Sequence, residues 1–149
     1  MRSWLAGALL LMLTTGCGQP PSSAAETSRT LEALRGQWVV INYWAKWCKP
    51  CIKEIPELNE LDSSYASVTV LGVNYDGATG AELAEQTQRF GVEFVSLGED
   101  PAALLQIPRP VVLPTTIILN PAGAVVQTLV GPQTLESLTL ATVDSGQDE

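Results

Sequence analysis

The chain has 149 residues, 46% of them hydrophobic and 16% charged, which suits one folded domain with a buried core and excludes an intrinsically disordered protein. Sixteen acidic residues against eight basic ones give a net charge of −8, which argues against a nucleic-acid partner.

The N-terminal residues 1–17 differ in composition from the rest of the chain. Met1 to Ser3 supply a positive start, and the apolar run from Trp4 to Leu13 is too short for a membrane-spanning helix, which needs about 20 residues. Such a run is typical of a secretory signal peptide. The following Thr14-Thr15-Gly16-Cys17 resembles the lipobox of bacterial lipoproteins, although Thr14 stands where an aliphatic residue is usual. We therefore expect a lipoprotein-type signal peptide ending at Cys17, the lipidated residue; the alternative is a plain signal peptide with an incidental cysteine.

Residues 18–28 are rich in Pro, Ser, Ala and Thr and have no apolar periodicity, so they are expected to form a flexible linker. The folded domain is expected at 29–143, followed by a disordered tail at 144–149.

The domain begins with a short helical turn at Leu31 to Gly36 and a continuous apolar run, Trp38 to Tyr43, typical of a strand that is buried on both faces. From Cys48 onward, apolar residues recur every three or four positions, which indicates one face of a helix: Ile52, Ile55, Leu58, Leu61 and Tyr65. Pro56 lies inside this helix and is expected to kink it.

The rest of the chain alternates between strand and helix patterns. Strands are expected at 68–75, 93–97, 115–119 and 125–130. Helical segments are expected at 81–90, 101–106 and 134–141, the last capped by Thr134. The early strand–helix–strand unit should be parallel, whereas Asn120 to Gly123 marks an antiparallel hairpin. The sequence therefore predicts an α/β fold, a three-layer α/β/α sandwich around a mixed sheet.

Two cysteines separated by two residues, Cys48 and Cys51, lie where the first strand gives way to the helix. The free N–H groups and positive dipole end of a helix N-terminus favour a thiolate, the species that attacks disulfides. A zinc site would need two further ligands, but the chain has no His and its third cysteine, Cys17, is far away. Redox chemistry is the favoured interpretation; a structural disulfide is the other one.

Three motifs in order give the chain a family resemblance. They are the run from Ile41 to Cys51, continued by residues 52–58; Leu113-Pro114-Thr115-Thr116; and Val130-Gly131-Pro132. In these the chain resembles the thioredoxin superfamily, and most closely its exported TlpA/ResA-like branch of thiol:disulfide oxidoreductases. The resemblance covers about residues 31–141.

The resemblance implies roles for individual residues. Cys48 matches the attacking cysteine, expected to be the more exposed, and Cys51 the resolving cysteine. Pro114 matches a cis proline that leaves the backbone of Leu113 free to pair with substrate; a trans proline entering an edge strand is the alternative reading. Trp47 matches a residue that contacts substrate.

A base is also expected for the Cys51 thiol. Thioredoxin has a buried aspartate on the strand before the cysteines, but the matching residue here is Asn42, which cannot titrate. Glu54, three residues after Cys51, is the candidate replacement, because the TlpA/ResA-like branch has a glutamate at this spacing and partial burial would raise its pKa. The alternative is a solvated glutamate in a charged turn.

The residues between the cysteines are expected to tune the redox potential. Lys49, like Lys46, should favour the Cys48 thiolate, and Pro50 takes the place that proline holds in reducing members of the family.

The function implied is a membrane-anchored, extracytoplasmic reductase of protein disulfides, lipid-anchored in the bacterial cell envelope and facing the periplasm, for example in cytochrome c maturation. Its partners would be protein dithiols or disulfides and a membrane electron donor of the thiol–disulfide type; no metal and no cofactor beyond the Cys48–Cys51 disulfide are expected. The alternatives are a disulfide oxidase or isomerase and a non-enzymatic thioredoxin-like binding module.

Overall fold

A computed structural model of the protein describes residues 23–143. The expected signal peptide with Cys17, the first part of the expected linker and the expected tail at 144–149 therefore lie outside the described residues.

A five-stranded mixed sheet forms the middle of the fold, in the order β3-β2-β1-β4-β5. Its strands are β1 (Trp38–Trp44), β2 (Val68–Asn74), β3 (Val95–Ser96), β4 (Thr115–Leu119) and β5 (Val125–Val130). β1 pairs in parallel with β2, and β2 in parallel with β3, whereas β4 is antiparallel to both β1 and β5. The parallel crossover and the antiparallel hairpin are as predicted, and β3 is shorter than the expected strand at 93–97.

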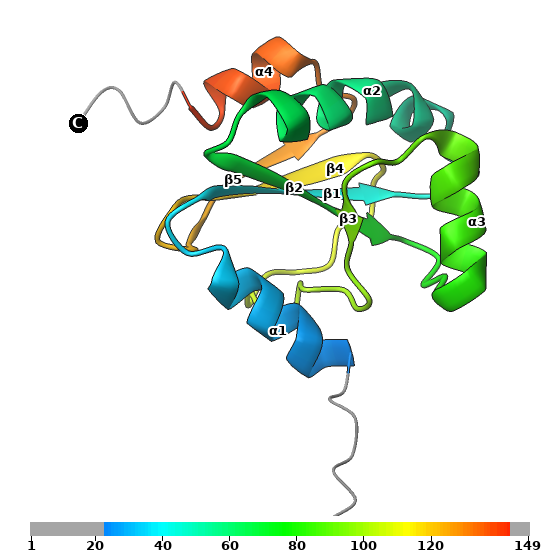
Figure 1. Ribbon diagram of the computed structural model, residues 1–149, viewed down its shortest axis with the longest axis horizontal. Helices are drawn as coiled ribbons and strands as arrows, with labels where there is room; N and C mark the ends of the chain where they lie inside the picture. Colours follow the sequence, from blue (N-terminus) through cyan, green and yellow to red (C-terminus); the bar gives the residue numbers. More distant parts are fainter. Residues whose placement is uncertain (1–22, 144–149) are drawn as a thin grey trace, which may run out of the picture.

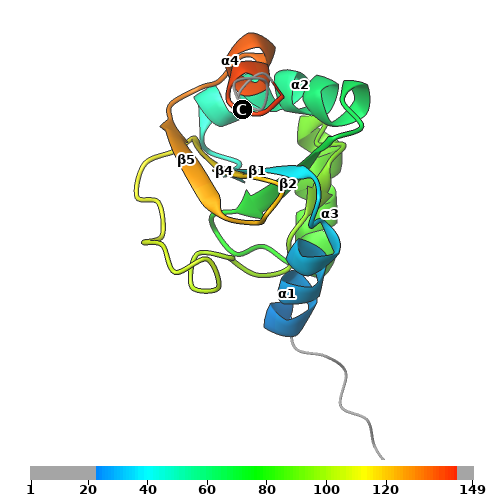
Figure 2. The same cartoon turned by 90° about the vertical axis from the view of Figure 1, so that its left-hand side faces the viewer.

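Helices cover both faces of this sheet, as Figure 1 shows. The four helices are α1 (Ser23–Ala33), α2 (Lys49–Ser64), α3 (Gly80–Phe90) and α4 (Leu135–Leu140). α2 and α4 lie over one face, and α1 lies under the other together with the segment that joins β3 to β4 (Figures 1 and 2). This is the predicted α/β/α arrangement. The expected helical turn at 101–106 consists of hydrogen-bonded turns, not a regular helix.

α1 begins at Ser23, inside the segment whose composition suggested a linker, which moves the start of the ordered fold forward from residue 29. Alanine and glutamate at positions 24–26 favour a helix. Thr27 is buried, and Leu31 and Leu34 pack against the apolar residues on the lower side of β1 and β4. Tertiary packing thus extends the helix into a sequence that has no clear apolar period of its own.

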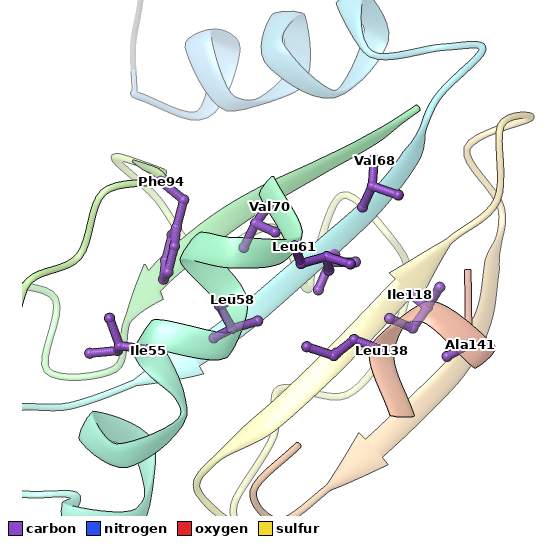
Figure 3. Close-up of a cluster of buried hydrophobic side chains, with 10 residues drawn as sticks. Ile55, Leu58, Leu61, Val68, Val70, Phe94, Ile118, Leu138 and Ala141 are labelled. Atoms are coloured by element: carbon purple, nitrogen blue, oxygen red, sulfur yellow. The ribbon is translucent and has the colours of Figure 1, made fainter. Parts of the chain in front are cut away.

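The main hydrophobic core lies between the sheet and the α2–α4 layer (Figure 3). Ile55, Leu58 and Leu61 descend from α2 onto Val40 and Val70, and Leu138 of α4 completes the cluster. A second cluster on the lower side takes the alternate residues of β1, including Ile41 and Tyr43. Burial on both faces explains why β1 reads as a continuous apolar run.

α2 continues through Pro56, which the sequence predicted as a kink and the structure places inside the helix. Cys48 is the N-cap of α2, and its side chain accepts a hydrogen bond from the backbone of Cys51. α4 begins at a capping box in which Thr134 and Ser137 each accept a hydrogen bond from the other's backbone N–H, as the sequence suggested for Thr134.

Among residues 23–143, no helix combines the length and the apolar character that a membrane crossing requires.

Candidate active site

The two cysteines form a disulfide at the N-terminal end of α2, with their Cα atoms 5.3 Å apart. The Sγ of Cys48 accepts a hydrogen bond from the Cys51 backbone N–H at 3.3 Å. An N–H donor at a helix N-terminus stabilises negative charge, so the same contact favours a Cys48 thiolate once the disulfide is reduced. The structure therefore describes the oxidised form of a site suited to reversible disulfide chemistry.

Cys48 is less accessible than the resemblance suggested. Its exposed fraction is 4%, against 0% for Cys51. Cys48 is thus the more exposed of the two, as predicted, but it is still buried. Trp44 and Ala45 pack around the disulfide, and Leu113 contacts the same cluster. The burial of Cys48 comes from this cluster, since Lys46 and Trp47, directly before it, are themselves exposed.

The peptide bond between Leu113 and Pro114 is cis, as the motif predicted. The Pro114 carbonyl accepts a hydrogen bond from Gly131 N at 2.9 Å, which ties the turn to the loop after β5. Within residues 23–143 the backbone N–H and C=O of Leu113 make no hydrogen bond. The turn thus presents an unpaired stretch of backbone beside the disulfide.

Trp47 is the most exposed aromatic residue near the site, with 60% of its surface accessible. Its indole Nε1 donates to both carboxylate oxygens of Asp76, at 3.0 and 3.1 Å. The local sequence around Trp47 does not identify this partner. Asp76 follows β2, and the C-terminal ends of the parallel strands β1 and β2 meet at the same edge of the sheet. That topology is the one signal that could have brought Asp76 to attention.

Glu54 is buried, with 2% of its surface exposed, which removes the solvated alternative. Its Oε1 accepts a hydrogen bond from Asn42 Nδ2 at 2.7 Å, and its Oε2 accepts one from Gln133 N at 2.8 Å. Burial raises the pKa of Glu54 above its ordinary range, while the donors from Gln133 and Asn42 act in the opposite direction. The side chain is therefore a buried carboxyl whose charged form is held by two donors.

Asn42 itself is completely buried on β1 and links Glu54 to β4. Its Nδ2 also donates to Thr116 Oγ1 at 3.2 Å, whereas its Oδ1 has no partner within the described residues. Sequence reasoning included Thr116 only as part of the cis-proline motif and did not identify Gln133, because Thr116 reaches Asn42, and Gln133 reaches Glu54, only through the fold.

The predicted tuning residues lie at the surface, next to the two cysteines in the sequence. Lys46, Lys49 and Pro50 are all exposed. The Nζ of Lys46 lies 3.5 Å from a carboxylate oxygen of Glu82 on α3. Exposed charges act weakly through water, so any effect of these lysines on the Cys48 thiolate should be modest.

No group of three or more His, Cys, Asp or Glu side chains within residues 23–143 is placed to hold a metal ion. The expectation that no metal and no separate cofactor take part stays a prediction.

The AhpC/TSA family matches residues 19–128 of the chain. A curated relative is the thiol-disulfide oxidoreductase ResA of Geobacillus kaustophilus, 34% identical over 110 residues. That alignment covers 72% of this chain and 63% of ResA, so the chain spans somewhat less than two thirds of that relative.

Two solved structures extend the likeness. StoA of Bacillus subtilis is 26% identical with a TM-score of 0.57, covering 70% of this chain and 81% of StoA. A DsbF homologue of Corynebacterium diphtheriae is 25% identical with a TM-score of 0.65, covering 77% and 75% of the two chains. Together with the cysteine pair and the mixed sheet, these matches show that the chain is a thioredoxin-like member of the AhpC/TSA family.

Proposed function

We propose that the protein is a thiol:disulfide oxidoreductase that reduces disulfides in other proteins. The observation that carries this proposal is the Cys48–Cys51 disulfide at the start of α2, beside the cis bond between Leu113 and Pro114. ResA, at 34% identity, bears the name of a thiol-disulfide oxidoreductase. A binding module would not need both thiols together with a buried carboxyl behind them.

In the first step the Cys48 thiolate of the reduced protein attacks one sulfur of a substrate disulfide. The substrate S–S bond breaks, the leaving sulfur takes up a proton, and a mixed disulfide joins Cys48 to the substrate. The backbone of Leu113, which makes no hydrogen bond within residues 23–143, would pair with an extended substrate segment, and the exposed Trp47 would give that segment an apolar contact.

In the second step Cys51 resolves the mixed disulfide. Glu54 accepts the Cys51 proton, the Cys51 thiolate attacks Cys48 Sγ, and the second substrate sulfur leaves as a thiolate that receives a proton. Two electrons have passed from the protein dithiol to the substrate, which becomes a dithiol. The Cys48–Cys51 disulfide is the product, and another dithiol must reduce it before the next cycle.

Reduction of insulin disulfides by dithiothreitol, followed by turbidity, tests this activity. The full chain is expected to accelerate the reaction, and Cys48→Ser and Cys51→Ser should each abolish the acceleration. A wild-type rate no faster than that of dithiothreitol alone would remove the proposal.

The direction of electron flow distinguishes the reductase from an oxidase or isomerase. We expect a reduction potential for Cys48–Cys51 closer to that of thioredoxin, about −270 mV, than to that of DsbA, about −120 mV. Equilibration with glutathione buffers, quantified by alkylation, gives the value. A reduction potential near that of DsbA would favour an oxidase or isomerase. The features that support this alternative are the Cys51 N–H contact with Cys48 Sγ and the neighbouring lysines.

We further propose that the protein is exported and anchored by a lipid on Cys17, facing the periplasm, and that a membrane thiol–disulfide donor returns it to the dithiol form. Apocytochrome c before haem attachment is a candidate substrate. Support comes from residues 1–17 and from the resemblance to the exported TlpA/ResA-like branch. Mass spectrometry of the membrane-extracted protein should show a diacylglyceryl adduct on Cys17, and Cys17→Ser should move the protein to the soluble fraction; an unmodified Cys17 would refute the anchor.

A further inference from the structure

The basic residues of this acidic chain are unevenly distributed. All three of its lysines, Lys46, Lys49 and Lys53, fall within the eight residues that contain the two active-site cysteines, a segment with no acidic residue. Residues 46–53 therefore carry +3, while the rest of the chain carries −11. We call the three lysines the lysine rim.

All three side chains of the lysine rim are exposed. Lys49 is the first residue of α2 and Lys53 lies one turn later on the same side of the helix, roughly 6 Å further along its axis. Neither Lys49 nor Lys53 makes an ion pair or side-chain hydrogen bond within residues 23–143, and the pairing of Lys46 with Glu82 leaves both side chains more than half exposed.

The nearby acidic side chains are held by other contacts. Asp76 accepts from the Trp47 indole, and Glu54 is buried against Asn42 and Gln133. Glu57, one turn beyond Lys53, accepts a hydrogen bond from Leu135 N at 2.8 Å. Lys49 and Lys53 thus have no carboxylate within ion-pair distance among residues 23–143.

We propose that the lysine rim is a docking surface for an acidic segment that flanks the disulfide in the protein substrate. The inference rests on the proposed function and names its substrate class. An acidic partner is repelled by most of this molecule and attracted at the rim, so the field orients the partner with its disulfide toward Cys48. Charges of this kind act mainly on the association rate and decay with salt, since the screening length is about 8 Å at physiological ionic strength.

Lys49 has a second expected effect, because it also lies beside the Cys48 thiolate. A change there alters the reactivity of the sulfur toward every substrate, acidic or basic. The ratio of kcat/KM between two substrates cancels this common factor. Lys53, which is further from the sulfur, is therefore the main position to vary.

The test uses the full chain and two peptides with the same disulfide loop, one flanked by acidic and the other by basic residues. In wild type at low salt we expect a higher kcat/KM for the acidic peptide, by about threefold to tenfold, and a ratio that falls toward one as sodium chloride is added. Lys53→Glu should lower the ratio several-fold. Arg29→Glu, an equal charge reversal on the exposed side of α1 across the sheet, is the matched control and should leave it unchanged.

A ratio near one in wild type, or an equal loss in Lys53→Glu and Arg29→Glu, would overturn the proposal.

A separate readout does not depend on turnover. The acidic peptide with both cysteines replaced by serine, titrated into the oxidised protein, should shift the amide resonances of residues 46–53 more than those of α1. If neither disulfide peptide is reduced but these shifts appear, the proposed function fails and the docking surface stands. If both peptides are reduced equally and no shifts appear, the docking surface fails and the proposed function stands. Binding of the rim to phosphatidylglycerol vesicles without any shift from the peptide would also overturn the proposal, because it would assign the surface to a membrane.

Discussion

Glu54 combines burial with two hydrogen-bond donors, and its protonation state decides how fast Cys51 can act. Only the charged carboxylate can take the Cys51 proton, so the rate of resolution should rise with pH as Glu54 ionises. Because burial raises the pKa of Glu54, the rate should rise at a higher pH than it would with an ordinary glutamate.

Replacement of Glu54 by glutamine should therefore slow turnover by about 10-fold to 100-fold at neutral pH and remove this limb from the pH–rate profile of kcat. The fold should persist, since glutamine keeps the size of the side chain. The wild type is expected to lose stability as pH rises from the unfolded toward the folded pKa of Glu54, because the folded state holds the proton more tightly; the variant should lack this slope. A pH profile of kcat identical to that of wild type would rule out an acid–base role.

Asn42 is the side chain within the described residues that donates a hydrogen bond to this carboxyl. Its Nδ2 lies 2.7 Å from Glu54 Oε1 and is steadied by Thr116. Removing the donor with Asn42→Leu should raise the Glu54 pKa further, because burial would then be opposed mainly by Gln133 N.

The Glu54 carboxyl ¹³C shift, followed against pH in the oxidised protein, measures this change without any need for activity. We expect the midpoint to move to higher pH in Asn42→Leu and, by a smaller amount, in Thr116→Val, which removes the contact that steadies the amide. An unchanged midpoint in Asn42→Leu would mean that burial and Gln133 alone set the pKa.

At the scale of the elements, β2 shows how closely the sheet packs against its surroundings behind the site. Gly72 lies in the middle of β2, and a Cβ there would meet Phe94 Cε2 at 3.0 Å and Trp44 Nε1 at 3.3 Å. Both rings are buried, so neither can swing away freely. The glycine is thus required by close approach and not by its backbone angles.

Gly72→Ala should accordingly lower the free energy of unfolding by about 1–3 kcal/mol, measured by urea denaturation. If the contact with Phe94 is the cause, Phe94→Leu in the Gly72→Ala background should cost less than Phe94→Leu alone. Additive losses in this double-mutant cycle would point to another origin.

The elements also show where local sequence information ends. The buried strands, α2 and α4 were predictable because their apolar patterns and capping residues are local features of the sequence. The start of α1 was not, since Ser23 to Ser28 become helical only because the residues that follow anchor the helix to the sheet. The segment at 101–106 was expected to be helical, but several prolines follow it and it forms turns instead of a regular helix.

At the scale of the whole molecule, the fold gathers the site from four separate stretches. The cysteine pair and the cis proline could be foreseen, since each lies in a short motif. The contacts of Asp76 with Trp47 and of Gln133 with Glu54 span 29 and 79 residues and follow only from the sheet order. The burial of Cys48 likewise depends on Leu113 and Trp44 arriving from different strand ends.

If Cys48 exchanges disulfides with protein substrates, it must form a mixed disulfide with them, and this intermediate can be trapped. In a chain carrying Cys17→Ala and Cys51→Ser, Cys48 is the remaining thiol, and incubation with oxidised insulin should yield an adduct, visible by intact mass, that dithiothreitol reverses. Further replacement of Cys48 by serine should eliminate it. If the single-thiol protein stays unmodified while Cys48 remains free to react with iodoacetamide, the account of this protein as a thiol:disulfide oxidoreductase is contradicted.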